Sequence, residues 1–180
     1  MRIVGGKLRG RIIVPPKKLN ARPTTDFAKE GLFNILNNHI DFEGLHALDL
    51  FAGTGSMGYE LMSRGAERVD AVELNPLHHK FIAQTAQQLG LHGHTAIRAD
   101  AFSFVERSQR RYDLIFADPP YDHERLAQLP DLIIAHGLLA DGGWLVLEHP
   151  AMYNFGGHAN FFDHRAYGSV NFSFFKKIAP

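Results

Sequence analysis

A carboxylate, two prolines and an aromatic ring stand in succession at residues 118–121, directly after the apolar run 112–117. Prolines lack a backbone N–H and have a fixed φ, so the carbonyls of Asp118 and Pro119 remain as rigid hydrogen-bond acceptors. The exocyclic amine of a nucleobase is a weak nucleophile, because its lone pair is delocalised into the ring. If the Asp118 carboxylate and the Pro119 carbonyl accept its two hydrogens, the nitrogen can aim its lone pair at a methyl sulfonium.

Tyr121 is placed to stack on such a base, a contact worth roughly 1–3 kcal/mol. Asp118, Pro119, Pro120 and Tyr121 are therefore the predicted catalytic residues of a methyl transfer to an amino group. This chemistry requires neither a metal nor a covalent intermediate. Carbon methylation of pyrimidines normally needs a thiolate, and the chain has no cysteine.

A glycine-rich turn, LDLFAGTGSMGYE at residues 48–60, follows the first predicted strand. Gly53, Gly55 and Gly58 form a GxGxxG pattern, which by itself fits two cofactors. In dinucleotide-binding proteins such a turn brings a pyrophosphate to a helix N-terminus. Asp49, just ahead of the turn, would repel phosphate and could instead hold an ammonium group. This favours S-adenosylmethionine, which has an amino-acid head and no phosphate, over NAD.

Two further acidic residues end the next predicted strands. Glu73 lies about twenty residues after Gly53, where a carboxylate can accept both ribose hydroxyls of either cofactor. Asp100 is placed to accept from the adenine amino group, with Ala101 and Phe102 flanking the ring. Each could instead cap a helix. Capping is a less satisfactory explanation for acidic residues at the ends of four successive predicted strands than for any one of them alone: Asp49, Glu73, Asp100 and Asp118.

These residues require a scaffold that gathers strand ends at one edge of a sheet. Helical spacing in TTDFAKEGLFNILNNHI predicts a first helix, capped by Thr24 or Thr25. After it, five short apolar runs alternate with segments of helical length, which predicts an α/β fold with a mostly parallel sheet covered on both faces. The segment NFFDHRAYGSVNFSFF predicts a closing antiparallel hairpin. In such sheets ligands bind beyond the carboxyl ends of the strands.

Composition narrows the class of protein further. The 180 residues are 45% hydrophobic and 21% charged, as in an ordinary globular chain of one domain. No apolar stretch is long enough to span a membrane, and the N-terminus lacks the apolar core of a signal peptide. We therefore expect a cytoplasmic protein. The eleven histidines lack metal-ligand spacing, and we interpret them as structural or surface residues.

Charge is distributed unevenly along the chain. Residues 1–30 hold eight Lys/Arg against two acidic residues, a balance of +6, and the other 150 residues hold eleven against seventeen, a balance of −6. A basic segment commonly contacts nucleic acid, although lysines also protect exposed sheet edges. Both interpretations stay open. We predict a basic arm over residues 1–22, forming a short β-hairpin within the same domain, and a catalytic domain over residues 23–180.

Taken together, these segments resemble the RsmD family of 16S ribosomal RNA guanine-N2 methyltransferases. The similarity includes RIVGGKLRGR, RPTTDFAKEGLFNIL, LDLFAGTGSMGYE, AVELN, DLIFADPPY and the closing YGSV. It implies a Rossmann-like class I methyltransferase fold with a seven-stranded sheet. It also implies S-adenosylmethionine as donor, S-adenosylhomocysteine as product, and a guanine of 16S ribosomal RNA as acceptor. The expected enzyme is a monomer that acts within a small-subunit assembly particle.

The resemblance also assigns residues. The cofactor would be bound by Asp49, Phe51, Gly53, Thr54, Gly55, Glu73, Leu74, Asp100, Ala101, Phe102 and Asp118. The RNA would be bound by Arg2, Lys7, Arg9, Arg11, Lys17, Lys18, Arg22, Thr24 and Lys29. At the last position the family usually has arginine, and lysine keeps the charge but loses the bidentate geometry.

Three other functions compete with this one. A DNA adenine-N6 or cytosine-N4 methyltransferase would share the Asp-Pro-Pro-Tyr segment, but it typically needs extra sequence to read a duplex. An NAD-dependent oxidoreductase would need a hydride-transfer site, which the sequence does not offer. A non-catalytic RNA-binding module would leave residues 118–121 unexplained.

Overall fold

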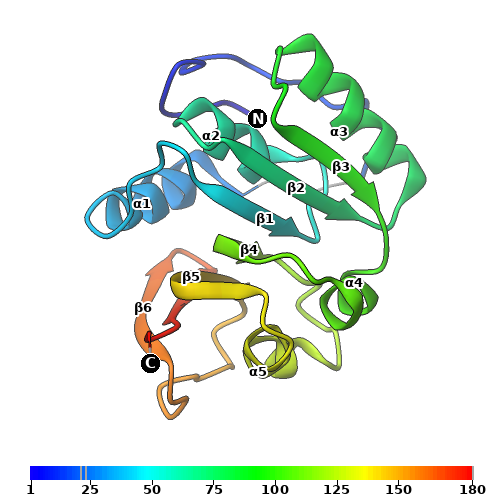
Figure 1. The fold of residues 1–180 in the computed structure, drawn as a ribbon. Coiled ribbons are helices and arrows are strands. Elements are labelled where there is room, and N and C mark those ends of the chain that lie inside the picture. Colours follow the sequence, from blue (N-terminus) through cyan, green and yellow to red (C-terminus); the bar gives the residue numbers. More distant parts are fainter. Residues whose placement is uncertain (21, 23, 180) are drawn as a thin grey trace.

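The computed structural model describes residues 1–20, 22 and 24–179, so both ends of the predicted 23–180 domain fall on residues outside the description. Helices and strands alternate along the chain as the apolar runs predict (Figure 1). The helices are α1 (Asp26–Leu36), α2 (Ser56–Ser63), α3 (Pro76–Gln88), α4 (Ala101–Arg107), a 3-10 turn (Leu126–Gln128) and α5 (Leu129–Ala135). The strands are β1 (His46–Leu50), β2 (Arg68–Glu73), β3 (His94–Arg98), β4 (Tyr112–Ala117), β5 (Leu139–His149), β6 (Phe161–Tyr167) and β7 (Val170–Lys176).

The strands form one seven-stranded sheet in the order β3-β2-β1-β4-β5-β7-β6. Strands β1 to β5 pair in parallel, whereas β7 is antiparallel to both β5 and β6. The predicted parallel sheet with a closing hairpin is thereby confirmed. Strand order reverses between β1 and β4, so the loops that follow these neighbouring strands diverge and leave room for a ligand.

Helices cover both faces of the sheet (Figure 1). On one face, α1 and α2 bury Leu32, Phe33 and Leu61 against β1, β4 and β5. On the other face, α4 and α5 bury Val105 and Ile133. Burial on both faces explains why the central strands are almost continuously apolar. The first helix begins as predicted, since the Thr25 hydroxyl accepts from the Ala28 N–H at 3.2 Å.

The N-terminal arm differs from the predicted β-hairpin. Residues 1–13 fold back on themselves, but they form only one antiparallel bridge, Arg2 to Ile12, and no strand. The backbone turns instead toward α2: the N–H groups of Val4 and Gly5 donate to the Glu60 carboxylate, both at 2.9 Å. Ile3 and Ile13 pack with Tyr59 of α2. The arm still pairs across itself where Met1 and Ile13 exchange backbone hydrogen bonds and the Ile3 N–H donates to the Arg11 carbonyl, and this pairing stops where Glu60 of α2 takes the next two donors.

Two features are absent from the described residues. No helix there has the length and apolar character needed to cross a membrane. Within the same residues, no three His, Asp or Glu side chains gather as metal ligands would.

Candidate active site

The glycine turn after β1 has an unusual backbone that the sequence accommodates. Phe51, Gly53 and Gly55 all have positive φ, of 58°, 60° and 89°. A Cβ on Gly55 would lie 2.6 Å from the ring of Tyr59, so only glycine fits there. The Tyr59 hydroxyl in turn donates to the Thr54 carbonyl at 2.8 Å. Tyr59 of α2 therefore supports the turn through its hydroxyl and its ring.

Asp49 is the most unusual carboxylate of the site. It is 1% exposed, and its Oδ2 atom has no hydrogen-bond partner. Burial raises the pKa of Asp49 to about 8, opposed by the Gly58 N–H and reinforced by the charge of Glu73. A buried acceptor without a partner is costly unless a ligand supplies one. An ammonium group would satisfy it, so the residues present fit the amino-acid end of S-adenosylmethionine.

Glu73 ends β2 as predicted and already organises the turn. Its Oε1 accepts from the Gly53 N–H and its Oε2 from the Asn75 N–H, both at 2.8 Å. Each oxygen keeps a second lone pair, so the carboxylate can still accept ribose hydroxyls. Leu74, which follows, is 60% exposed beside this carboxylate.

Asp100 caps α4, and its Oδ2 accepts from the Ser103 N–H at 2.9 Å. Asp100 therefore does cap a helix, which was the alternative to adenine binding. Its Oδ1 atom accepts no hydrogen bond from α4. Ala101 and Phe102 are buried. The ring of Phe102 stacks on His123 with centroids 4.7 Å apart, and the Arg125 guanidinium lies 4.5 Å from its centroid. Sequence analysis missed His123 and Arg125, because only the fold brings the loop after β4 to α4.

Asp118 follows β4 and lies beside Glu148, which the sequence analysis also missed. Register explains the pairing, since Ala117 of β4 aligns with Leu147 of β5 and the next residues are therefore neighbours. Burial, the nearby Glu148 carboxyl and the more distant Asp49 together raise the pKa of Asp118 well above its usual value. Glu148 ends a strand run with an acidic residue, the same signal that identified Asp118.

Two hydroxyls bind the Glu148 carboxylate. The Thr24 hydroxyl donates to Oε1 at 3.1 Å and the Tyr121 hydroxyl to Oε2 at 3.2 Å. Glu148 is only 6% exposed, whereas Tyr121 is 38% exposed. Pro119 is buried and Pro120 exposed. Glu148 thereby links the segment before α1, the Asp-Pro-Pro-Tyr loop and β5.

A small cavity of about 40 Å³ lies at the carboxyl ends of β1 and β4. Asp49 and Asp118 reach it from the sheet, and Arg22 and Thr24 reach it from the segment before α1. The structure therefore brings the predicted cofactor turn together with Asp118 of the predicted catalytic loop. The other predicted catalytic and cofactor residues do not line this cavity: Pro119, Pro120, Tyr121, Glu73, Leu74 and residues 100–102. Its lining consists of Arg22, Thr24, Asp49, Phe51, Ala52, Gly53, Thr54, Ser56, Met57, Phe116 and Asp118.

The predicted RNA contacts divide into two groups. Most of the basic side chains are exposed: Arg2, Lys7, Arg9, Arg11, Lys17, Lys18 and Arg22. Lys29 is an exception, and its predicted RNA contact is wrong for this structure. It is 1% exposed, and its Nζ donates to the Arg2 carbonyl at 2.7 Å and to Ser56 Oγ at 3.0 Å. It also lies 3.6 Å from Glu60 Oε1, so it joins the arm to α2 instead.

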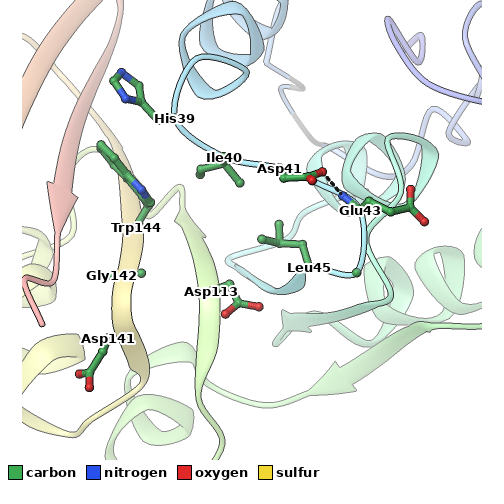
Figure 2. Close-up of a pocket in the computed structure, with 11 residues that line it drawn as sticks. His39, Ile40, Asp41, Glu43, Leu45, Asp113, Asp141, Gly142 and Trp144 are labelled. Atoms are coloured by element: carbon green, nitrogen blue, oxygen red, sulfur yellow. Dashed lines mark hydrogen bonds between the residues drawn. The ribbon is translucent and has the colours of Figure 1, made fainter.

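A larger hollow, of about 310 Å³, lies at the opposite end of the sheet (Figure 2). Its carboxylates, Asp41, Glu43, Asp113 and Asp141, are all exposed. Two of them accept from backbone groups: Asp41 from the Glu43 N–H at 3.0 Å, and Asp113 from the His46 N–H at 2.9 Å. None of the predicted site residues lines this hollow.

The sheet order, the glycine turn and the buried strand-end carboxylates define the class I fold of S-adenosylmethionine-dependent methyltransferases. Comparison with known proteins identifies the branch. The sequence pattern of the family described as "Conserved hypothetical protein 95" matches residues 1–176, and the chain belongs to this family, the RsmD family.

Individual relatives agree with this assignment. "Putative rRNA methyltransferase YlbH" of Bacillus subtilis is 34% identical over 153 residues, covering 83% of this chain and 82% of the relative. "Ribosomal RNA small subunit methyltransferase D" of Escherichia coli K12 is 31% identical over 148 residues, covering 82% and 74%. Among solved structures, "Putative methyltransferase yhhF" from Escherichia coli superposes with a TM-score of 0.86 at 28% identity, covering 100% of this chain and 99% of that one.

Proposed function

We propose that this protein transfers a methyl group from S-adenosylmethionine to the N2 amine of a guanine in 16S ribosomal RNA. The observation that carries the proposal is the pair of carboxylates on adjacent strands at one cavity. Asp49 offers an unpaired acceptor for an ammonium group, and Asp118 follows the neighbouring strand as an acceptor for an amine. The relatives named as ribosomal RNA methyltransferases support the choice of RNA.

The cofactor is bound through its polar ends. Asp49 Oδ2 accepts from the ammonium group, and the turn from Phe51 to Gly55 supports the methionine chain. Glu73 accepts from the ribose hydroxyls through its free lone pairs. Asp100 accepts from the adenine amino group, next to the ring cluster of Phe51, Phe102 and His123.

The target base enters beside Asp118 after leaving its stack in the RNA. The Asp118 carboxylate and the Pro119 carbonyl accept the two N2 hydrogens, so the nitrogen lone pair is no longer held in the plane of the ring. Tyr121 stacks on the base and fixes its angle of approach. Aligned approach of this kind corresponds to effective molarities worth roughly 7–11 kcal/mol.

When bound, S-adenosylmethionine supplies an electrophilic methyl group on a positively charged sulfur and leaves as S-adenosylhomocysteine. The nitrogen lone pair forms the new N–C bond, and the electron pair of the broken C–S bond stays on sulfur. The methylated nitrogen then loses one proton. Asp118 accepts this proton and passes it to solvent, which balances the reaction.

The basic side chains of residues 1–22 bind the RNA backbone. These side chains are exposed, and the arm is fixed to the domain through Glu60 and Lys29. Arg22 and Thr24 continue from this surface into the cavity. The substrate we expect is a small-subunit assembly particle.

The decisive experiment is incubation with labelled S-adenosylmethionine and either small-subunit RNA or small-subunit particles, followed by digestion to nucleosides. The expected product is N2-methylguanosine. A label on adenine N6 or cytosine N4 of the RNA would overturn the choice of guanine. Labelling of duplex DNA, offered in a parallel incubation, without labelling of RNA would overturn the proposal in favour of a DNA amino-methyltransferase.

A further inference from the structure

We infer that Glu148 is a specificity-determining residue that accepts the N1–H of the target guanine while Asp118 accepts from its N2 amine. This inference deepens the proposed function and rests on it. It assigns a role to a buried glutamate that the transfer step itself does not use.

The position of Glu148 follows from the sheet. Side chains alternate along each strand, and β4 and β5 run parallel in register at Ala117 and Leu147. Asp118 and Glu148 therefore extend from the same face of the sheet, at the same edge. Asp49 of β1 lies on this face as well, two residues from Ala47, which packs in the core below α1. Glu148 is thus the carboxylate that borders Asp118 on the side away from the cofactor turn.

Hydrogen-bond donors hold this carboxylate but do not saturate it. Its two oxygens accept one hydroxyl each, from Thr24 and Tyr121, and each has a second lone pair. The described contacts of Glu148 include no lysine or arginine. The carboxylate therefore keeps acceptor capacity next to the Asp118 carboxyl, and its described contacts bring no cation to neutralise it.

The hydrogen-bonding edges of the bases determine which base fits two adjacent carboxylates. Guanine presents two adjacent donors on its Watson–Crick edge, the N1–H and the N2 amine. Adenine presents its N6 amine beside N1, and cytosine its N4 amine beside N3, and both ring nitrogens are acceptors. Two adjacent carboxylates match the guanine edge, whereas either other base would set a lone pair against Glu148. Binding sites discriminate strongly against a substrate that leaves one of their buried polar groups unpaired, because the desolvation of that group is not repaid.

The hydroxyl of Tyr121 has a role in the same arrangement. Because it donates to Glu148, the ring that stacks on the base is tied to the group that reads the base edge. Thr24 ties the segment before α1 to the same carboxylate. Glu148 is therefore also a positioning residue for both segments.

The test uses 2-aminopurine, which keeps the amine at C2 but has an acceptor at N1. The substrate is the small-subunit RNA, or particle, that the wild-type enzyme methylates, with the modified guanine replaced by 2-aminopurine through ligation of a synthetic segment. We expect the wild-type enzyme to prefer guanine by at least about a hundredfold in kcat/KM. Glu148→Gln should reduce this preference to within about tenfold, because its amide can donate to N1. Glu148→Asp keeps the charge and should keep the preference, with a lower kcat.

Several outcomes separate the possibilities. A preference that is unchanged in Glu148→Gln, or absent in the wild-type enzyme, overturns the inference and leaves guanine methylation intact. Absence of N2-methylguanosine in the wild-type digest overturns the proposed function itself, and this inference with it. S-adenosylhomocysteine affinity within a few-fold of wild type shows that the variants are folded. Glu43→Gln, an exposed glutamate at the other end of the sheet, is the matched control and should keep the wild-type preference.

Discussion

The two ends of the parallel strands differ in the volume of their cavities and in the burial of their carboxylates. The hollow where β1, β4 and β5 begin is several times larger than the cavity at their carboxyl ends, about 310 Å³ against about 40 Å³ (Figure 2). Both ends carry several carboxylates. Those of the large hollow are exposed to water, whereas Asp49 at the small cavity and Glu148 beside Asp118 are buried.

Burial, rather than cavity volume, distinguishes the carboxylates at the carboxyl ends of the strands. A carboxylate in water has its hydrogen bonds satisfied by solvent and gains little from a ligand. A buried carboxylate gains much more from a ligand donor, because its alternative is to remain unpaired or to take up a proton. The raised pKa values of Asp49 and Asp118 express this difference.

The largest effect is expected at β4, whose two ends carry one aspartate each. Asp118→Ala should lower methyl transfer by about a hundredfold or more, since the amine loses its acceptor. S-adenosylmethionine affinity should stay within a few-fold. Asp113→Ala, at the other end of the same strand, should leave the rate within about twofold. Steady-state rates and calorimetric titration of both variants measure this, and an Asp118→Ala enzyme within tenfold of wild type would remove the acceptor role.

Asp49→Asn should act on the cofactor instead of the amine. We expect S-adenosylmethionine affinity to fall by about 10- to 100-fold, because a charged hydrogen bond to the ammonium group is lost. The free protein should melt at a higher temperature, because a buried unpaired carboxylate is removed. Asp41→Asn in the large hollow should change neither quantity. Unchanged cofactor affinity in Asp49→Asn would place the ammonium group elsewhere.

The basic arm provides a test that involves salt. Replacing Lys7, Arg9 and Arg11 together by Ala should flatten the dependence of log RNA affinity on log salt by about two to three units. Cofactor affinity should hardly change. A matched triple at the acidic hollow, Asp41→Asn with Glu43→Gln and Asp141→Asn, should leave the slope as it is. If the arm variant keeps the wild-type slope but aggregates more, its charges protect the surface and do not bind phosphate.

The smallest effect concerns pH. The pKa of Asp49 is raised from 3.8 to about 8 in the free protein, so its burial destabilises the free fold increasingly as the pH rises from about 4 to about 8. The bound ammonium needs the ionised form, so binding should release a proton below pH 8. Cofactor affinity should rise about fivefold between pH 7 and pH 8, in proportion to the ionised fraction. Titration calorimetry in buffers of different ionisation enthalpy measures the number of protons released on binding. Asp49→Asn should abolish this release.

The pattern of the sequence was enough to predict the parallel sheet and its closing hairpin, and it named the candidate residues of the site. Apolar runs alternating with helical spacing gave the parallel sheet, since burial on both faces requires continuous apolar strands. Strand-end acidic residues gave Asp49, Glu73 and Asp118, because parallel strands bring their carboxyl ends to one edge. Pro119 and Pro120 predicted rigid carbonyl acceptors, because proline has a fixed φ and no backbone N–H.

Which of these residues lie together, and which charged side chains are exposed, depends on the packing of the whole domain. Glu148 is an acidic residue near the end of an apolar strand, as Asp118 is, but only the register of β5 against β4 places the two side by side. Lys29 has the composition of an RNA contact, yet α1 buries it on Glu60 and Ser56. Phe102 is covered by His123 and Arg125 from a loop distant in the chain. Such contacts depend on how strands are ordered and how helices pack, and that order is a property of the whole sheet rather than of any local pattern.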